Sequence, residues 1–255
     1  MTHLSLFSGI GGLDLAAEWA GFETVGQCEF ADYPTKVLEK HWPDVPRWRD
    51  IRTLSKESFY ERTGLRTVDV ISGGFPCQPF SVVGKQKGKG DDRYLWPEML
   101  RVIRELRPHC VVGENVPGIL RIAAGQVVKD LEQAGYHVVV LCFEAAAVGA
   151  WHRRARVFFV AYAEGKRGQG CAAIRPAVQA EGTWEMQSDK CRCDVSTNNA
   201  DGCWWAVEPD VGRMASGIPH RVDRLKCLGN AVVPQQAYPI FRALREELTR
   251  MEETT

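Results

Sequence analysis

A cysteine held between two prolines is the residue of this sequence best suited to covalent chemistry. Cys77 lies within residues 73–81, which read GGFPCQPFS. Proline fixes its own φ angle and restricts the residue before it, so Phe75 and Gln78 are driven toward extended conformations. The preceding run Val68–Ile71 predicts a short buried strand. The thiol is therefore expected on a stiff loop at the carboxyl end of a strand, where open α/β sheets bind ligands.

A carboxyl group is expected at the same edge of the sheet. The predicted strand His109–Val112 runs into Gly113 and Glu114, and a proline follows at 117. Glu114 has two interpretations, a catalytic carboxyl or a structural acid that caps the next helix. For Cys77 the alternative is an apolar cysteine packed in a turn. Because both groups fall at the carboxyl ends of strands, the pattern favours catalysis for both.

Two arginines precede the last predicted strand of the sheet. Residues 151–156 read WHRRAR and lie between the predicted strands His137–Phe143 and Arg156–Tyr162. If the segment is extended, the alternating Arg154 and Arg156 point to one face. Two neighbouring guanidinium groups would then share an anion or a carbonyl group.

A glycine turn near the amino terminus predicts a nucleotide cradle. A predicted strand, His3–Phe7, is followed by SGIGG at 8–12 and by a helical pattern at Leu13–Ala20. Glycines let the backbone approach a ligand, and the start of the helix offers free N–H groups. The next strand, Thr24–Cys28, ends in Glu29, which is placed to accept hydrogen bonds from ribose hydroxyls. The spacing lacks the full three-glycine pyrophosphate pattern, so a nucleoside without a diphosphate is favoured, with S-adenosylmethionine as the candidate. Asp50 either reaches the adenine amine or caps a surface helix.

Composition indicates a soluble globular protein. The 255 residues are 45% hydrophobic and 25% charged, enough for one large domain with a small insertion. No apolar run has the length of a membrane span, no signal peptide is apparent, and the nine cysteines are scattered. Reduced thiols and a cytoplasmic location are expected.

The net charge is zero, but basic residues gather locally, which indicates either a positive face for nucleic acid or ordinary solvated surface. The basic runs are Arg153 to Arg175, Arg213 to Lys226, and Lys85 to Lys89.

The pattern of elements predicts an α/β fold with a mostly parallel, Rossmann-like sheet. Residues 1–163 are expected to form the catalytic and cofactor-binding domain, 164–212 a small insertion, and 213–255 a return segment that completes the domain. Further helices are predicted near Tyr33–His41, Leu95–Leu106, Gln126–Ala134 and Gln235–Thr249. The glycine- and lysine-rich segment Val82–Arg93 is expected to close over a ligand, or else to be a plain connector. The cysteines of the insertion do not have the spacing of paired zinc ligands, so no metal is expected. They are Cys171, Cys191, Cys193 and Cys203.

Taken together, these motifs resemble the cytosine-C5 DNA methyltransferases of the compact bacterial or phage type. The matching segments, in order, are LFSGIGG at 6–12, Glu29, Asp50-Ile51, GFPCQPFS at 74–81, ENV at 114–116, RAR at 154–156 and GNAV at 229–232. They cover about four-fifths of the chain, everything but the insertion. Ser5 stands where the family often has an acid, and His152 replaces a common glutamine. The family's ninth motif is not recognisable before Arg221, and the insertion is short.

The resemblance implies an S-adenosylmethionine-dependent fold and a flipped cytosine as substrate. It implies that Cys77 is the nucleophile for carbon 6, that Glu114 acts at ring N3, that Arg156 polarises O2, and that Arg154 braces the loop or a phosphate. The implied cofactor contacts are Phe7, Gly9, Gly11, Gly12, Glu29, Phe30, Asp50, Ile51, Pro76, Leu95, Asn230 and Ala231. The implied DNA contacts are Gln78, Ser81, Lys85, Lys87, Lys89, Arg93 and Arg153.

The expected partner is double-stranded DNA, bound by a monomeric enzyme of restriction-modification type that either accompanies a cognate restriction nuclease or is an orphan. Three alternatives remain open at this stage. One is the same reaction on structured RNA, because a transfer-RNA branch of the family carries the same catalytic motifs. Another is a catalytically silent regulatory module, against which the intact Cys77, Glu114 and Arg156 argue. A third is an RNA- or metal-binding role for the insertion.

Overall fold

A computed structural model describes residues 1–76, 94–163, 184–185 and 219–253. Its central sheet has the strand order β3-β2-β1-β4-β5-β7-β6-β8. The strands are β1 (Thr2–Leu6), β2 (Glu23–Cys28), β3 (Arg47–Trp48), β4 (Val70–Gly73), β5 (Cys110–Asn115), β6 (Tyr136–Phe143), β7 (Arg156–Ala163) and β8 (Trp184–Glu185). The pairs from β3 to β5 are parallel, whereas β7 runs antiparallel to both β5 and β6. The prediction of a mostly parallel α/β fold is therefore confirmed.

The order of the strands reverses between β1 and β4. From β1 the chain builds outward to β2 and β3, and β4 then begins the other half of the sheet. The register pairs Leu6 with Gly73 and Gly73 with Gly113, so the carboxyl ends of β1, β4 and β5 lie side by side. Such a switch point is where open α/β sheets bind their ligands. The predicted glycine turn and the predicted nucleophile loop thus leave adjacent strands at this point.

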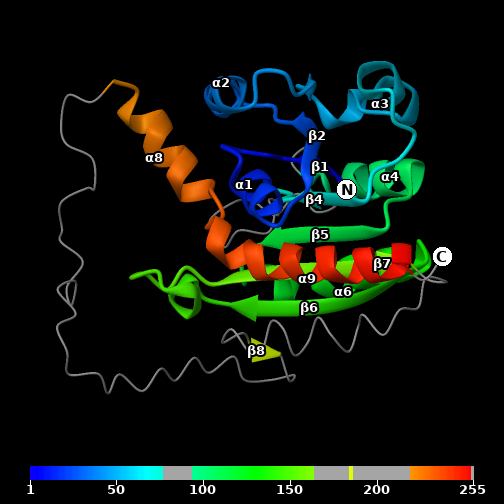
Figure 1. The fold of residues 1–255 in the computed structure, drawn as a ribbon. Coiled ribbons are helices and arrows are strands. Elements are labelled where there is room, and N and C mark those ends of the chain that lie inside the picture. Colours follow the sequence, from blue (N-terminus) through cyan, green and yellow to red (C-terminus); the bar gives the residue numbers. More distant parts are fainter. Residues whose placement is uncertain (77–93, 164–183, 186–218, 254–255) are drawn as a thin grey trace.

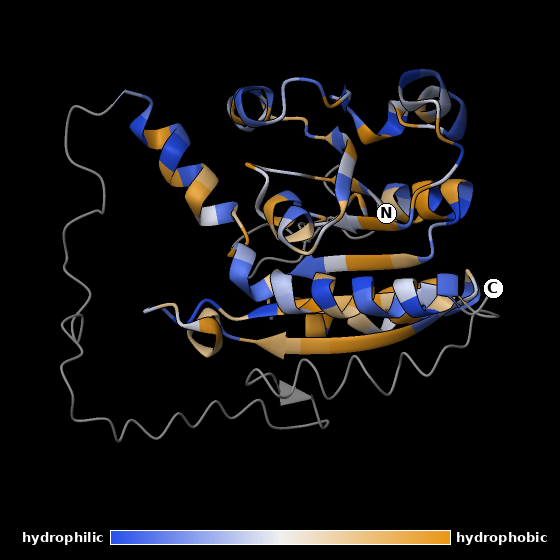
Figure 2. Ribbon diagram, in the orientation of Figure 1, coloured by the Kyte–Doolittle hydropathy of each residue, from blue (hydrophilic) through white to orange (hydrophobic). Residues whose placement is uncertain are grey.

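Helices cover both faces of the sheet (Figure 1). They are α1 (Gly12–Trp19), α2 (Asp32–His41), α3 (Lys56–Thr63), α4 (Trp96–Leu106), α5 (Ile119–Ile122), α6 (Ala124–Gln133), α8 (Arg221–Asn230) and α9 (Pro234–Glu253), with 3-10 turns η1 (Ile51–Thr53) and η3 (Ala145–Val148). On one face Leu13 of α1 and Phe241 of α9 pack against Val112 and Val160. Figure 2 shows that α9 alternates hydrophobic and hydrophilic positions, as a helix buried on one side should.

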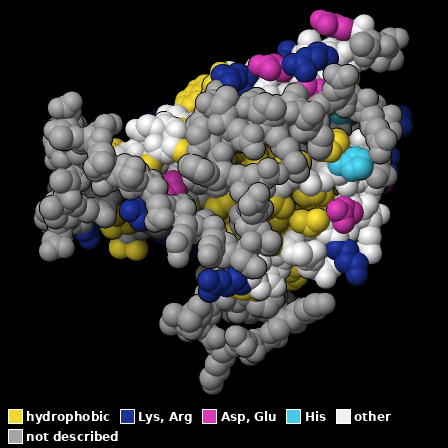
Figure 3. Space-filling model, turned by 90° about the horizontal axis from the view of Figure 1, so that it is seen from below, with side chains coloured by type: hydrophobic (Ala, Val, Ile, Leu, Met, Phe, Trp, Pro, Cys, Tyr) yellow, Lys and Arg dark blue, Asp and Glu magenta, His cyan; other side chains and the backbone are white. Residues whose placement is uncertain are grey.

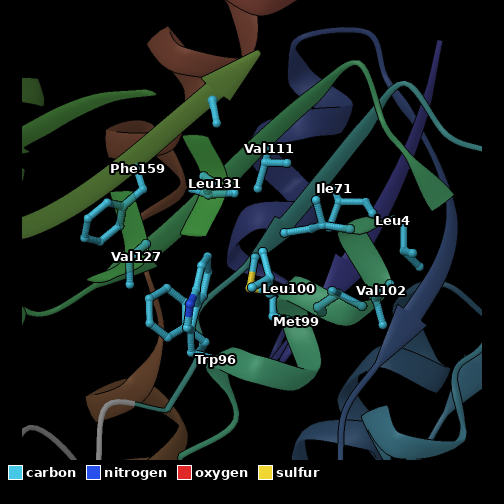
Figure 4. Close-up of a cluster of buried hydrophobic side chains, with 14 of the residues drawn as sticks. Leu4, Ile71, Trp96, Met99, Leu100, Val102, Val111, Val127, Leu131 and Phe159 are labelled. Atoms are coloured by element: carbon cyan, nitrogen blue, oxygen red, sulfur yellow. The ribbon is translucent and has the colours of Figure 1, made fainter. Parts of the chain in front are cut away.

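The other face of the sheet carries the larger core. Met99 and Val102 of α4, with Val127 and Leu131 of α6, pack against β-strand residues that include Ile71 (Figure 4). The strand side chains labelled in that view come from β1, β4, β5 and β7, so this cluster unites the two halves of the sheet. The carboxyl ends that carry the predicted site rest on this packed layer.

A chain of polar side chains is buried beneath the glycine turn. Asp14, in the first turn of α1, accepts hydrogen bonds from Ser5 Oγ (2.8 Å) and Gln27 Nε2 (2.8 Å). Arg47 Nε in turn donates to Gln27 Oε1 over 2.9 Å. Burial raises the pKa of Asp14 to about 6, although both hydrogen bonds oppose the shift. Ser5 stands where the family often has an acid. In this chain it donates a hydrogen bond to the carboxyl group of Asp14 instead.

Most predicted elements are present with shifted ends. β4 begins two residues later than predicted, and β5 continues through Glu114 and Asn115, which are therefore strand residues. Helices α3 and α8 were not predicted. The insertion 164–212 lies outside the described residues except for β8, which pairs with β6.

Within the described residues, no helix has both the length and the apolar content needed to cross a bilayer.

The described charged side chains do not gather in one patch on the face shown in Figure 3. The described side chains there include hydrophobic residues in the middle and both acidic and basic residues toward the margin. Within the described residues, this view does not present the single positive face that the basic runs suggested.

Candidate active site

A buried ion pair lies at the carboxyl edge of the sheet. Glu114 on β5 faces Arg156 at the start of β7, with Oε1 and Nε 2.8 Å apart. The two residues are only 8% and 9% exposed. Burial raises the pKa of Glu114 to about 7, and the positive charges of Arg156 and Arg154 oppose that rise. Near neutral pH this carboxyl group can therefore both hold and release a proton, as a catalytic acid or base must.

The chain leading to the predicted nucleophile is anchored beside this pair. Phe75 is buried against Trp96, with ring centroids 4.9 Å apart. Asn115, the neighbour of Glu114, donates from Nδ2 to the Phe75 carbonyl oxygen over 2.9 Å. A Cβ placed on Gly74 would lie 2.9 Å from Glu114 Oε2, so a larger residue there would push the carboxyl group from its position. Cys77 itself lies just outside the described residues.

The extended conformation predicted for the segment that holds Arg154 and Arg156 is wrong. Arg154 has a left-handed backbone (φ 39°), which breaks the alternation expected of an extended segment. Its Nη2 donates to the carbonyl oxygens of Leu228 (3.1 Å), Gly229 (2.7 Å) and Ala231. Arg156, two residues on, turns instead to Glu114. The Arg154 guanidinium group therefore bonds backbone carbonyl groups near the end of α8, while the positive charges of both arginines act on Glu114.

The glycine turn after β1 is closed by the acid at the end of β2. Glu29 Oε2 accepts a hydrogen bond from the Gly9 N–H, and Oε1 accepts one from the Ala31 N–H, each over 2.8 Å. Phe7 (φ 53°) and Gly9 (φ 56°) both have left-handed backbones, which turn the chain sharply between β1 and α1. The N-cap residue of α1 is Gly11, which has no side chain that could bond the first N–H groups of the helix. Its first N–H groups are thus available to a polar ligand.

The return segment packs directly on this turn. A Cβ placed on Gly12 would lie 2.7 Å from the carbonyl oxygen of Val232. Val232 follows Asn230 and Ala231, which end α8, so two further residues of the predicted cofactor set lie beside the glycine turn. This close backbone contact explains why Gly12 is a glycine. Segments separated by some two hundred residues in the sequence therefore meet at one place.

The other predicted cofactor residues have varied surroundings. The exposed Phe30 is 75% accessible, whereas Ile51 is buried in the core. Asp50 caps η1 by accepting a hydrogen bond from the Arg52 N–H over 3.0 Å, which is the alternative role considered for it. Leu95 precedes α4, and Pro76 is the last described residue before the gap. Their cofactor role stays a prediction.

Most of the predicted DNA contacts lie outside the described residues. These are Gln78, Ser81, Lys85, Lys87, Lys89 and Arg93. The remaining one, Arg153, is exposed on the connection between β6 and β7. The four cysteines of the insertion are also outside the described part. Among the residues that the structure describes, no cluster of three or more His, Cys, Asp or Glu side chains could hold a metal ion.

One residue that positions the site was missed. Gln236, fully buried in the first turn of α9, donates from Nε2 to the carbonyl oxygens of Phe143 (3.2 Å) and Arg154 (3.0 Å). Its place among apolar residues of an amphipathic helix was the available signal. A polar side chain at a buried position implies partners, but the sequence does not say which.

Comparison with known proteins agrees with the geometry. The sequence profile of the C-5 cytosine-specific DNA methylase family matches residues 1–197. The Type II methyltransferase M.NgoFVII of Neisseria gonorrhoeae is 36% identical over 162 residues, which are 62% of this chain and 42% of that protein. M.FnuDI of Fusobacterium nucleatum is 35% identical over 167 residues, 64% of this chain and 47% of the relative. The chain thus matches less than half the length of these two relatives.

A solved structure shows the same fold. The crystal structure of Schizosaccharomyces pombe Dnmt2 methyltransferase superposes with a TM-score of 0.58 at 22% identity, covering 74% of this chain and 58% of the other. The family profile spans more than three-quarters of the sequence and includes Cys77, Glu114 and Arg156. The chain belongs to the C-5 cytosine-specific DNA methylase family.

Proposed function

We propose that this protein transfers a methyl group from S-adenosylmethionine to carbon 5 of cytosine in DNA. The observation that carries the proposal is the buried Glu114–Arg156 pair, which lies against the backbone of Gly74, three residues before Cys77. Carbon 5 of cytosine is a poor nucleophile. A protein that methylates it must first activate the ring, and the residues at this edge are of the types required.

The residues around the glycine turn fit a nucleoside cofactor. The N–H groups that begin α1 have no capping side chain, and Glu29 keeps further lone pairs for ribose hydroxyls while it holds the turn. Phe30 offers an exposed aromatic ring beside Glu29. We assign the cofactor to Phe7, Gly9, Gly11, Gly12, Glu29, Phe30 and Asp50, with Asn230 and Ala231 from the return segment. When bound there, S-adenosylmethionine supplies an electrophilic methyl group.

Cys77 activates the cytosine ring by covalent addition. Its thiolate forms a bond to carbon 6, and the electron pair of the 5,6 double bond makes carbon 5 nucleophilic. Glu114, whose pKa is raised to about 7, donates a proton to ring N3 and so neutralises the charge that addition creates. Arg156 holds the Glu114 carboxyl in place and donates to the O2 carbonyl. After methylation N3 returns its proton to Glu114. A base, for which water suffices, then removes the proton from carbon 5, and the thiolate leaves as the 5,6 double bond re-forms.

These groups cannot reach a base stacked within a duplex. The cytosine must be extruded from the helix, at a cost of about a few kcal/mol. Covalent connectivity keeps Cys77 next to Pro76 and hence near the anchored Phe75. We therefore place the extruded base between this loop and the Glu114–Arg156 pair.

The proposal is tested by incubating the protein with methyl-labelled S-adenosylmethionine and with either DNA or transfer RNA. Bisulfite sequencing of DNA from expressing cells then locates the product. We expect label in DNA, at carbon 5 of cytosine. Label in transfer RNA alone would change the assigned substrate, and no transfer to either polymer would favour a silent regulatory module.

A further inference from the structure

Arg154 joins two parts of the chain that are distant in sequence. It lies in the connection between β6 and β7, and its guanidinium group bonds the carbonyl oxygens of Leu228, Gly229 and Ala231. These carbonyl groups end α8, where the last turn of a helix leaves oxygens without partners and carries a partial negative charge. A guanidinium group suits that place, because it is planar, permanently charged and has several donors.

The same connection is also held from α9. Gln236 Nε2 donates to the carbonyl oxygens of Arg154 (3.0 Å) and of Phe143 (3.2 Å), so one side chain spans the start and the end of the connection. Within it, the Ala145 N–H donates to the Arg153 carbonyl oxygen over 2.6 Å. Hydrogen bonds from the side chains of Arg154 and Gln236 to backbone carbonyl groups therefore join the β6–β7 connection to the segments on both sides of residues 230–233. We call residues 230–233, between α8 and α9, the hinge.

Each side of this junction leads to a different half of the proposed site. The hinge side continues into Val232, whose carbonyl oxygen packs on Gly12 of the glycine turn. The other side continues from Arg154 to Arg156, which holds the Glu114 carboxyl group. Within the described part of the chain, most residues of α8 are exposed and only Cys227 is buried, so the helix has little apolar packing of its own. Figure 1 shows α8 extending away from the sheet beyond the carboxyl ends of the strands.

We propose that Arg154 is a positioning residue that couples the cofactor site to the base pocket by holding the α8–α9 hinge against the β6–β7 connection. This inference rests on the proposed function. Of the two roles that the resemblance implied for Arg154, it develops the bracing of the loop and replaces the contact with a phosphate. Coupling of this kind makes the binding of one ligand favour the other, typically by about 5- to 150-fold in affinity.

Arg107 provides a matched control. It too has a left-handed backbone (φ 51°), and its Nη1 donates to the Ala134 carbonyl oxygen over 2.6 Å, at the end of helix α6. Arg107→Ala thus removes a guanidinium group from the end of a helix, as Arg154→Ala does, but away from the proposed site. Arg154→Lys keeps the positive charge with a smaller spread of donors and provides a variant close to the native chemistry.

The first measurement is the affinity of the full-length protein for S-adenosylhomocysteine, by isothermal titration calorimetry without DNA. We expect Arg154→Ala to weaken binding by about tenfold, Arg154→Lys to recover part of the loss, and Arg107→Ala to stay within about twofold of wild type. Melting temperatures of all variants show how far each change destabilises the fold.

The second measurement repeats the titration in the presence of a duplex that the wild-type protein methylates. In wild type the DNA should tighten cofactor binding, and in Arg154→Ala this enhancement should be lost. Equal losses in Arg154→Ala and Arg107→Ala, or an enhancement retained by Arg154→Ala, would overturn the inference and leave the proposed function intact. A wild-type protein that binds no S-adenosylhomocysteine would overturn the proposed function, and the inference with it.

Discussion

Asn115 donates a hydrogen bond from Nδ2 to the carbonyl oxygen of Phe75 over 2.9 Å, and both residues are buried. This bond joins β5, the strand that carries Glu114, to the chain that leads into Cys77 two residues later. The Asn115 Oδ1 accepts a hydrogen bond from the Val116 N–H, which fixes the orientation of the amide. The acid of the proposed reaction and the approach to its nucleophile are therefore held by adjacent residues of one strand.

Removing this bond should slow the reaction more than it weakens binding. Asn115→Ala leaves a buried carbonyl group unpaired and frees the chain before Cys77, and misplacement of a reacting group by about 1 Å can cost about 100-fold in rate. We expect kcat to fall by about 10- to 100-fold while the affinity for S-adenosylhomocysteine changes little.

Thr67→Val is the matched control for this variant. The Thr67 Oγ1 also donates to a carbonyl oxygen, that of Leu106, over 2.6 Å. Thr67 lies just before the amino end of β4, whereas the site lies at the carboxyl end of that strand. It should lower the melting temperature and leave kcat unchanged. If both variants lose kcat equally, the Asn115 bond is only structural.

The acid role of Glu114 predicts a specific pH dependence. With a pKa raised to about 7, the protonated carboxyl group that donates to N3 is lost as the pH rises through that value. The wild-type kcat should therefore decline on this limb. Glu114→Gln should lower kcat by about 100- to 10,000-fold and abolish the limb.

Glu247→Gln serves as the control for this pH profile. Glu247 on α9 is 8% exposed, as Glu114 is, and also pairs with an arginine, Arg250, whose side chain is largely exposed. Its replacement should preserve both the rate and the pH profile. An unchanged profile in Glu114→Gln would remove the carboxyl group from proton transfer.

The contact between Gly12 and Val232 predicts a selective loss of cofactor binding. A Cβ at position 12 would meet both the carbonyl oxygen and the side chain of Val232 within 3 Å, so Gly12→Ala must displace the hinge. We expect S-adenosylhomocysteine to bind at least about tenfold more weakly, which corresponds to about 1.4 kcal/mol.

Gly125→Ala in α6 is the comparison for Gly12→Ala. A Cβ there meets nothing within 4 Å, and alanine favours a helix over glycine by about 1 kcal/mol. It should leave cofactor affinity unchanged and raise the melting temperature slightly. If Gly12→Ala binds S-adenosylhomocysteine as tightly as the wild type does, the position of the hinge does not affect the cofactor site.

Burial of Asp14 predicts a pH-dependent gain of stability on its removal. Its pKa rises from 3.8 to about 6 on folding, so between these values the folded state binds more protons and stability falls as the pH rises. In Asp14→Asn the amide can accept from Gln27 and donate to Ser5. We expect the variant to be more stable by about 2–3 kcal/mol at pH 8, or roughly 4–12 °C in Tm, and the advantage to vanish near pH 4.

Buried His3 acts in the opposite direction. Its pKa is lowered to about 3, so it destabilises the fold as the pH falls below 6.5. Both proteins share this contribution, and it cancels in the difference between their Tm values measured by calorimetry across that pH range. A difference that does not vary with pH would show that Asp14 is not charged and buried as described.

The parts of the site predicted from sequence are those encoded by local order. Glu29 was recognised because it ends the strand after a glycine turn, and it does bond that turn through the Gly9 N–H. Glu114 was recognised as the acid at the carboxyl edge beside the loop of Cys77. In both cases the residue type and its place at a strand end are enough, because parallel strands bring their carboxyl ends together.

The parts that escaped prediction depend on distant contacts or on weak periodicity. Arg154 was placed with Arg156 because alternation presupposes an extended chain, whereas its left-handed φ is fixed by partners at 228–231. Helix α8 was missed because it buries only Cys227 and so has no apolar stripe. Helix α3 escaped prediction for the same reason, because it buries only Phe59. Its capping box also uses Ser58 where glutamate or glutamine is usual.

The central claim is that the sulfur of Cys77 bonds to carbon 6 of an extruded cytosine, and a mechanism-based trap tests it most directly. Duplex DNA containing 5-fluorocytosine cannot lose a proton from carbon 5, so after methyl transfer the enzyme should remain attached. With S-adenosylmethionine present, we predict a covalent protein–DNA complex that survives denaturation, with the link mapped to Cys77 by mass spectrometry, and no complex in Cys77→Ser. An enzyme that methylates ordinary DNA yet never forms this complex would contradict the account.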